Sequence, residues 1–351
     1  MGNSNCDLEI NVMMVGGRRC GKTSVLASMQ RCFEATLRNT SLIIKCANDE
    51  MLETIEEKQQ EMKQYFVESR FFVPNENETS DWSSYPFNVR IKGKESRIRI
   101  NFVDYPGEWL TGKKDEVRKN LRESRILLVA IDTPHLVEEY GLYNNPHNRC
   151  SIVSELIEDV EFAETDEPGL ILFVPLKCER YYNKGEMDEV NRKVQQAYKK
   201  TIDYIRKPSA DGRKGNITMA ITPILTLGEG VEFSRFERDD KGKVKVNERY
   251  GTPTKALYKF TDIGKKSKEP DPKYCEQPLF YVLLYVLAQA KMAKEAKKKK
   301  DALSFLIDLF QTKILNWSSA DDYLLQEDAI LKELKKDGDG YSILDKGILK
   351  L

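Results

Sequence analysis

The sequence predicts an α/β fold with a mainly parallel sheet, one antiparallel hairpin strand, helices on both faces of the sheet and a C-terminal helical extension. Two observations predict it. Dense apolar runs, typical of strands covered on both faces, alternate with segments of helical periodicity. In addition, two segments of alternating polarity are joined by a short turn, which is the pattern of a hairpin. Strands that alternate with helices favour a parallel sheet with right-handed crossovers.

The chain opens with a predicted strand, a glycine-rich loop and a predicted helix. Residues 8–15 (LEINVMMV) form a short apolar run that ends at two glycines. Residues 24–37 (SVLASMQRCFEATL) then place apolar side chains at helical spacing. Residues 47–70 are rich in Glu, Lys, Gln and Met and predict an exposed helix, and residues 74–84 predict a polar loop.

The predicted hairpin consists of PFNVRI (86–91) and SRIRINFVD (96–104), joined by KGKE. Beyond it, three dense apolar runs predict further strands, and segments with helical patterns lie between them. The predicted strands are residues 125–132, 170–176 and 216–227, and the predicted helices are residues 151–164 and 188–207.

Three parts of the chain are predicted. Residues 8–228 form the α/β core. Residues 229–277 hold charge clusters, glycines and prolines, and predict a charged irregular insertion or loop. Residues 278–351 predict helices that pack on the core or extend it. The expected C-terminal helices cover residues 278–300, 301–316 and about 321–336.

Composition limits the classes of partner. Lysine and arginine number 56, as do aspartate and glutamate, so no excess of positive charge indicates nucleic-acid binding. The seven cysteines show no metal-ligand spacing and suit a reducing, cytoplasmic compartment. With His135 and His147 alone, the sequence offers little for a histidine metal site. The lysine run 297–300 beside the amphipathic segment 301–310 could contact an anionic membrane, but a solvated helix end is the favoured explanation.

The glycine-rich loop, GGRRCGKT at residues 16–23, fits the pattern G-x-x-x-x-G-K-[ST] in full. Its glycines would let backbone N–H groups face phosphate oxygens, and the following helix would add its dipole. Lys22 would contact the β- and γ-phosphates, and the Thr23 hydroxyl would bind Mg²⁺. The alternative is a structural turn with a solvent-exposed lysine. The predicted nucleotide-binding residues here are Gly17, Arg18, Arg19, Cys20, Gly21, Lys22, Thr23 and Ser24.

A second motif, INFVDYPGEW at residues 100–109, follows the hairpin. Asp104 ends a hydrophobic strand and is placed to hold magnesium. Gly107, three residues later, would let a backbone N–H approach the γ-phosphate, so the next segment would respond to that phosphate. An ordinary turn is the alternative for this short pattern.

Together these residues resemble the P-loop GTPases of the translation-factor and Ras-like (TRAFAC) class. The resemblance rests on GGRRCGKT, on a hairpin whose second strand ends in DYPG, and on a later strand ending in LKCE, and it covers residues 8–228. The DYPGEW form is similar to that of bacterial YcjX-like and double-GTPase conflict-system proteins. The resemblance implies GTP or GDP as the ligand and Mg²⁺ as the cofactor, with Thr23 and Asp104 at the metal.

The resemblance also implies a switch threonine before the hairpin, for which Thr79 is favoured over Ser83 and Ser84. Ras-like proteins carry a glutamine after the glycine of DxxG, whereas this chain has Glu108. A carboxylate repels the γ-phosphate and donates no hydrogen bond to it, so slow hydrolysis is expected. Arg19, or Arg18, could act as a built-in arginine finger, or both could face solvent.

The guanine signature N-K-x-D is half matched by Leu176, Lys177, Cys178 and Glu179. The Lys177 stem can lie across the base, and the Glu179 carboxylate can accept hydrogen bonds from the guanine edge. An ordinary charge pair at a strand end is the alternative.

The predicted function is a GTP-binding protein with slow magnesium-dependent hydrolysis that acts as a nucleotide-state switch. Segments 72–84 and 104–120 would signal to an unidentified protein partner, and the C-terminal helices offer a second docking surface. Two alternatives remain open: a P-loop ATPase, and a nucleotide-stabilised scaffold without significant turnover.

Overall fold

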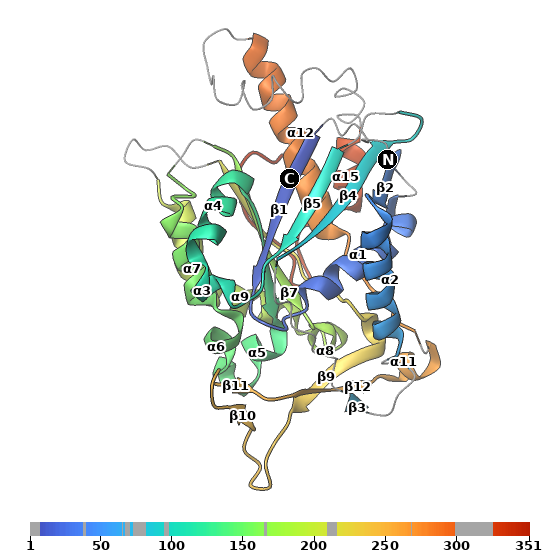
Figure 1. Cartoon of the computed structure of the whole chain (residues 1–351), viewed down its shortest axis with the longest axis vertical. Coiled ribbons are helices and arrows are strands. Elements are labelled where there is room, and N and C mark those ends of the chain that lie inside the picture. The colour runs from blue at the N-terminus through green and yellow to red at the C-terminus, as the bar shows by residue number, and fades with distance from the viewer. Residues whose placement is uncertain are drawn as a thin grey trace.

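An eight-stranded sheet runs through the centre of the protein (Figure 1). The computed structural model describes residues 8–37, 40–64, 66, 71–72, 82–94, 98–164, 167–208, 216–267, 269–298 and 326–351. The strands, in sheet order, are β13 (Ser342–Lys346), β8 (Ile217–Ile221), β7 (Gly169–Leu176), β6 (Ile126–Asp132), β1 (Leu8–Gly16), β5 (Ile98–Asp104), β4 (Ser83–Ile91) and β2 (Leu42–Cys46).

The five central strands β8, β7, β6, β1 and β5 are parallel to one another. β4 pairs antiparallel with β5, with Asn88 opposite Arg99, so the predicted hairpin is confirmed. Two edge strands were not expected from the sequence. β2 pairs antiparallel with β4, and β13 pairs antiparallel with β8. Each is only five residues long, which is too short for a clear alternating pattern.

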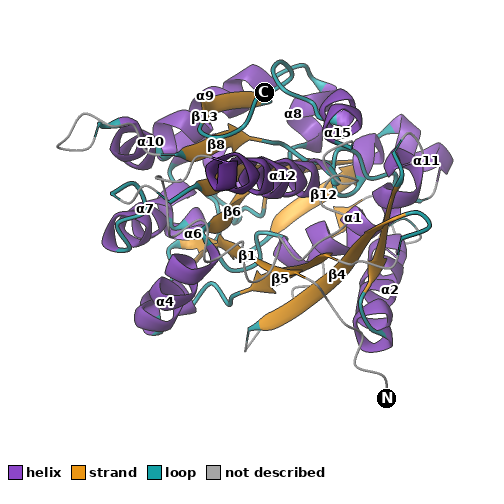
Figure 2. Ribbon diagram, turned by 90° about the horizontal axis from the view of Figure 1, so that it is seen from above, coloured by secondary structure: helices purple, strands orange, loops and turns teal. Residues whose placement is uncertain are grey.

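Helices cover both faces of the sheet (Figure 2), which confirms the predicted fold class. One face packs against α1 (Lys22–Thr36), α2 (Asp49–Gln64), α12 (Gln277–Lys298) and α15 (Glu327–Glu333). The other face packs against α3 (Trp109–Gly112), α4 (Lys114–Ser124), α7 (Cys150–Asp159), α9 (Met187–Ala197) and α10 (Lys199–Arg206). β6 and β7 are buried along their whole lengths, as expected for apolar strands covered on both faces.

Residues 229–277 contain regular structure where the sequence predicted an irregular insertion or loop. A second sheet has the order β3-β12-β9, and a short hairpin forms from β10 and β11. These strands have few residues, so their periodicity is weak, although the alternation in VEFSRF was a usable signal. The elements of this part are η3 (Gly228–Gly230), β9 (Val231–Phe236), β10 (Val246–Asn247), β11 (Thr252–Pro253), β12 (Ala256–Phe260) and α11 (Asp262–Ser267). The third strand of the second sheet, β3 (Phe71–Phe72), comes from the segment after α2.

The insertion, as we call residues 229–277, lies at the end of the molecule toward which β1 runs (Figure 1). Its small core contains Phe233, Phe236 and Tyr258, together with Phe66 from the segment after α2. Parallel strands present their carboxyl ends at one edge of a sheet, and this edge is where ligands bind in open α/β folds. The insertion therefore stands beside the expected site.

The C-terminal part combines helix and strand. α12 is buried on all sides from Leu279 to Leu287. The predicted helix 301–316 lies outside the described residues, and so do the side chains of the lysine run 297–300. The third predicted helix is represented by α15, and β13 then joins the main sheet. Within the described part of the chain, no helix combines the length and apolar character required to span a membrane.

Candidate nucleotide-binding site

The glycine-rich loop joins the end of β1 to the start of α1, as predicted. Gly21 has a φ of 106°, a backbone conformation that disfavours residues with a Cβ. A Cβ on Gly17 would lie 1.8 Å from the His147 carbonyl oxygen, so only glycine fits there. Cys20 is buried in the core. The loop's shape therefore depends on both glycines.

Lys22 and Thr23 both contact Asp104. The β1–β5 register sets Met14 opposite Asp104, so the carboxylate lies beside the loop that follows β1. The Lys22 ammonium is 3.5 Å from Asp104 Oδ1, and the Thr23 hydroxyl donates a 3.1 Å hydrogen bond to Asp104 Oδ2. Ser24 is half-buried in the first turn of α1. The consecutive residues Lys22 and Thr23 thus form one cluster with Asp104, which is distant from them in the sequence.

The donor set at Asp104 suits a hard divalent cation. Asp104 is 1% exposed, and its Oδ1 accepts no hydrogen bond from the described residues. Burial raises the pKa of the Asp104 carboxyl, although Lys22 opposes the shift. Burial alone would lower the pKa of Lys22, but Asp104, together with Cys20 and Glu108, outweighs burial and the pKa is raised. An under-coordinated carboxylate oxygen and a nearby hydroxyl are the ligand types that Mg²⁺ prefers.

Gly107 packs directly on the glycine-rich loop. A Cβ on Gly107 would lie 2.6 Å from the Arg18 backbone nitrogen, so a side chain there would displace the loop. Glu108 immediately precedes α3, and its Oε1 lies 3.5 Å from Arg18 Nε. The DxxG segment and the loop therefore touch through both backbone and side chains.

The switch-residue candidates lie in different places. Thr79 is outside the described residues. Ser83 begins β4 and pairs with Asp104 across the hairpin, next to the predicted metal ligands. Ser84, on the opposite face of the strand, donates a hydrogen bond to Asn101. Of the two serines, Ser83 is therefore the one beside Asp104.

Lys177 lies against the glycine-rich loop. Its ammonium donates a 2.8 Å hydrogen bond to the carbonyl of Arg19, which has a φ of 60°. It also lies 2.7 Å from Asp132 Oδ2. The lysine thus links the end of β7 to the loop and to the end of β6.

Glu179 is placed differently from a base-reading carboxylate that faces an open pocket. It is 3% exposed and accepts a 3.2 Å hydrogen bond from the Leu227 backbone N–H. Burial raises the pKa of Glu179 to about 7. The carboxylate therefore braces the loop after β8, and contact with a base would require it to leave that position.

The raised pKa of Glu179 predicts that the free energy of unfolding depends on pH. The unfolded Glu179 has its ordinary pKa of 4.5, whereas the folded value is about 7, so between these values the folded protein retains a proton that the unfolded chain has released. The free energy of unfolding of wild type relative to Glu179→Gln should therefore fall by about 3 kcal/mol from about pH 4 to pH 8. Urea unfolding of both proteins at a series of pH values measures this difference. If the difference in unfolding free energy between wild type and Glu179→Gln does not change with pH, the raised pKa of Glu179 is wrong.

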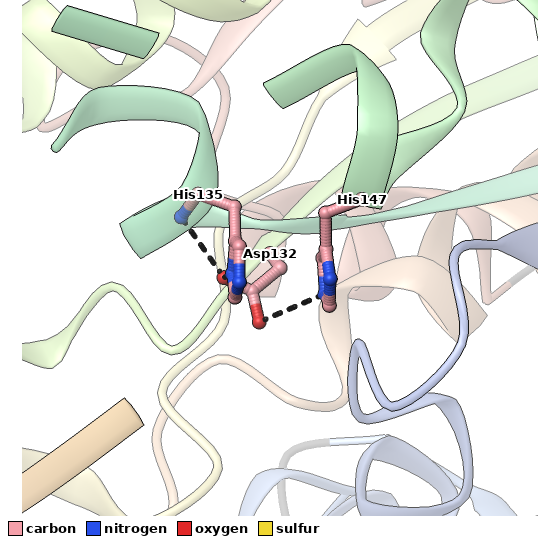
Figure 3. A group of neighbouring side chains, drawn as sticks. All are labelled: Asp132, His135 and His147. Atoms are coloured by element: carbon pink, nitrogen blue, oxygen red, sulfur yellow. Dashed lines mark hydrogen bonds and ion pairs between the residues drawn. The ribbon is translucent and has the colours of Figure 1, made fainter. Parts of the chain in front are cut away.

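Asp132, His135 and His147 form a buried charge network that the sequence did not predict (Figure 3). Asp132 Oδ1 is 2.6 Å from His135 Nδ1, and Asp132 Oδ2 is 3.5 Å from His147 Nε2. Burial alone would raise the pKa of Asp132, but His135 and Lys177 hold it well below its ordinary value. Burial, followed by the effect of His135, lowers the pKa of His147 to about 4, so this ring is neutral near neutral pH. The sequence signal that could have identified this network is Asp132, a carboxylate at the end of the apolar strand β6.

The network fits a metal ion poorly. The rings of His135 and His147 are stacked, with centroids 3.6 Å apart and planes 5° from parallel. Ring-nitrogen lone pairs lie in the ring planes, so those of stacked rings do not converge on one ion at the ~2.0 Å required. The Lys177 ammonium also already neutralises Asp132. We therefore interpret the group as a support for the loop, since the His147 carbonyl contacts Gly17.

The fold and the arrangement of these motifs define a P-loop GTPase. Residues 10–206, more than half of the chain, match the family model described as Double-GTPase 2, and the chain belongs to this family. Family membership supports a GTP-binding protein and bears out the predicted resemblance.

Comparisons with other proteins add little detail. No curated protein matches the chain. Among solved structures, the chain is similar to the S. cerevisiae Ski7 GTPase-like domain, bound to GDP and inorganic phosphate, with 11% sequence identity and a TM-score of 0.35. The similarity covers 70% of this chain and 47% of that one, so the chain spans less than half the length of that structure.

Proposed function

We propose that this protein binds Mg²⁺·GTP and hydrolyses it slowly, changing the conformation of segments 72–84 and 104–120 with the state of the nucleotide. The observation that supports this most directly is the cluster of Lys22, Thr23 and Asp104 at the loop between β1 and α1. A glycine loop, an ammonium, a hydroxyl and a buried carboxylate are the groups that a magnesium-bound triphosphate requires.

The proposed roles follow from the contacts. The loop's backbone N–H groups and the start of α1 bind the phosphates, and Lys22 exchanges its contact with Asp104 for the β- and γ-phosphates. Thr23 and Asp104 hold Mg²⁺, which neutralises the phosphate charge. Gly107, already against the loop, presents its N–H to the γ-phosphate. Catalysis then depends on positioning and charge neutralisation.

Glu108 makes this hydrolysis slow. Its carboxylate lies beside Arg18 at the end of the site where water would attack. The negative charge opposes a second negative charge on the γ-phosphate, and a carboxylate offers no N–H donor to it. In the proposed scheme Arg18 partly offsets that repulsion.

Guanine selection is assigned to the Lys177–Glu179 end of the site. Lys177 is held against the loop, where its stem can lie over a base. Glu179 would turn from Leu227 to the guanine N–H groups, whereas adenine presents an acceptor there and repels a carboxylate. The existing bond to Leu227 is the one observation that favours the ATPase alternative, since it makes the guanine contact costly.

We also propose that a protein partner reads the nucleotide state through the two switch segments, with the C-terminal helices as a second docking surface, in a cytoplasmic setting. The cysteines among the described residues are free thiols, and most are buried, which supports a reducing environment.

Thermal unfolding with GTP, GDP, ATP or ADP, each with and without Mg²⁺, tests the proposal. A ligand at about 100 times its Kd stabilises the folded state by about 2.7 kcal/mol. We expect GTP and GDP to stabilise the protein, with magnesium increasing the effect of GTP, and ATP to do so much less. Equal stabilisation by ATP would transfer the proposal to an ATPase, and no stabilisation by any nucleotide would overturn it. Single-turnover phosphate release separates slow hydrolysis from a scaffold without turnover.

A further inference from the structure

The insertion contacts the start of the first predicted switch segment, 72–84. Its strand β12 pairs antiparallel with β3, with Tyr258 opposite Phe72 at the start of segment 72–84. The Phe66 and Phe260 rings pack with their centroids 5.4 Å apart. The insertion is thus joined to the core at one end by backbone pairing and by its own small core.

At its other end, the insertion contacts the glycine-rich loop. Tyr250, between β10 and β11, places its ring with the centroid 5.2 Å from Arg18 Cζ. A guanidinium at this distance from an aromatic ring is attracted by the ring's negative face. A residue of the insertion therefore contacts a residue of the predicted nucleotide site, more than two hundred positions away in the sequence.

The β10–β11 hairpin is joined to the end of β9 by backbone hydrogen bonds that do not involve Tyr250: the Lys245 N–H donates to the Glu237 carbonyl, and the Glu237 N–H donates to the Lys255 carbonyl. Side-chain contacts then hold this end of β9 in place. The Phe236 ring lies 4.9 Å from the His135 ring and 5.9 Å from the Tyr143 ring, measured between centroids. Arg238 forms an ion pair with Glu139. A change at Tyr250 should therefore leave the hairpin in place.

Arg18 lies at the γ-phosphate end of the loop. Its backbone nitrogen is the atom that Gly107 approaches, and Gly107 is the residue proposed to face the γ-phosphate. Its guanidinium is shared between Glu108 and Tyr250. An added γ-phosphate would compete with the carboxylate for this cation, whereas the aromatic contact leaves its charge available.

We propose that Tyr250 is a positioning residue that holds the Arg18 guanidinium where a γ-phosphate can reach it, and that the insertion thereby increases the preference for GTP over GDP. This inference rests on the proposed function, because it concerns the same site. Tyr250 acts through Arg18 and makes no contact with the nucleotide itself.

The test compares Tyr250→Leu, which removes the aromatic face, with Tyr250→Phe, which keeps it. Affinities for a non-hydrolysable GTP analogue and for GDP are measured at fixed Mg²⁺. We expect Tyr250→Leu to weaken the GTP analogue by about two- to fivefold while GDP affinity is unchanged, since a cation–π contact contributes on that scale. Tyr250→Phe should match wild type. Tyr140→Leu is the control, because Tyr140 is fully exposed nearby on η2 (Glu139–Gly141).

A double-mutant cycle with Arg18→Ala completes the design. If Tyr250 acts through Arg18, then Tyr250→Leu should have no effect on analogue affinity once Arg18 is alanine. An equal loss of analogue and GDP, or additive effects in the cycle, would overturn the inference while the proposed function stands. If wild type binds neither guanine nucleotide, the proposed function is overturned and this inference with it.

Discussion

Lys22→Ala is expected to lower the affinity for Mg²⁺·GTP by about 100-fold or more. Lys22 is 8% exposed, and in the structure its ammonium faces the Asp104 carboxylate. In the proposed complex it makes hydrogen bonds to two phosphates, and losing two charge-assisted hydrogen bonds of about 1.5 kcal/mol each gives this factor. Titration of a fluorescent GTP derivative in the presence of Mg²⁺ measures the affinity directly.

The control for Lys22→Ala must separate binding from folding. Lys58→Ala removes a lysine of α2 that pairs with Glu61 and lies away from the predicted site, and it should bind GTP as wild type does. Because Lys22→Ala leaves Asp104 buried without its cation, urea unfolding of Lys22→Ala shows whether this variant is folded under the conditions of the titration. Tight GTP binding by a folded Lys22→Ala protein would show that the loop does not bind phosphates.

Asp132→Ala is expected to lower the free energy of unfolding by about 3–5 kcal/mol, the cost of breaking a buried charge network by removing one partner. Asp132 is fully buried, and its carboxylate contacts Lys177, His135 and the His135 backbone N–H. Urea unfolding at neutral pH measures the loss. Asp132→Asn keeps an acceptor for these donors and should cost less.

Loss of the Asp132 carboxylate should also weaken nucleotide binding. Asp132→Asn removes the negative charge 2.7 Å from the Lys177 ammonium, which also contacts the Arg19 carbonyl, so this variant should weaken GTP binding even where the protein remains folded. Asp203→Ala is the matched control, because its ion pair with Lys199 is exposed and contributes at most about 1 kcal/mol. A stability loss no larger than that of Asp203→Ala would contradict the role given to the network.

The sequence by itself determined the α/β class and the positions of the main strands along the chain, because their apolar runs and helical segments are local patterns that burial imposes on neighbouring residues. It also identified the loop that ends in Lys22 and Thr23, since the glycines and the strand–loop–helix context are contiguous. Asp104 could be placed beside that loop because parallel strands bring their carboxyl ends together.

Tertiary structure alone decided which distant residues meet. The insertion's sheet, the strands β2 and β13, and the contact of Tyr250 with Arg18 depend on pairings between segments far apart in the chain. The rings of His135 and His147 stack because two successive short helices, α5 (Thr133–Val137) and α6 (Asn144–Asn148), pack together. Glu179 shows the same limit, because its motif position suggested the base while burial directs its carboxylate to Leu227. Local periodicity reports which face of an element is buried, whereas long-range packing selects the neighbour that covers it.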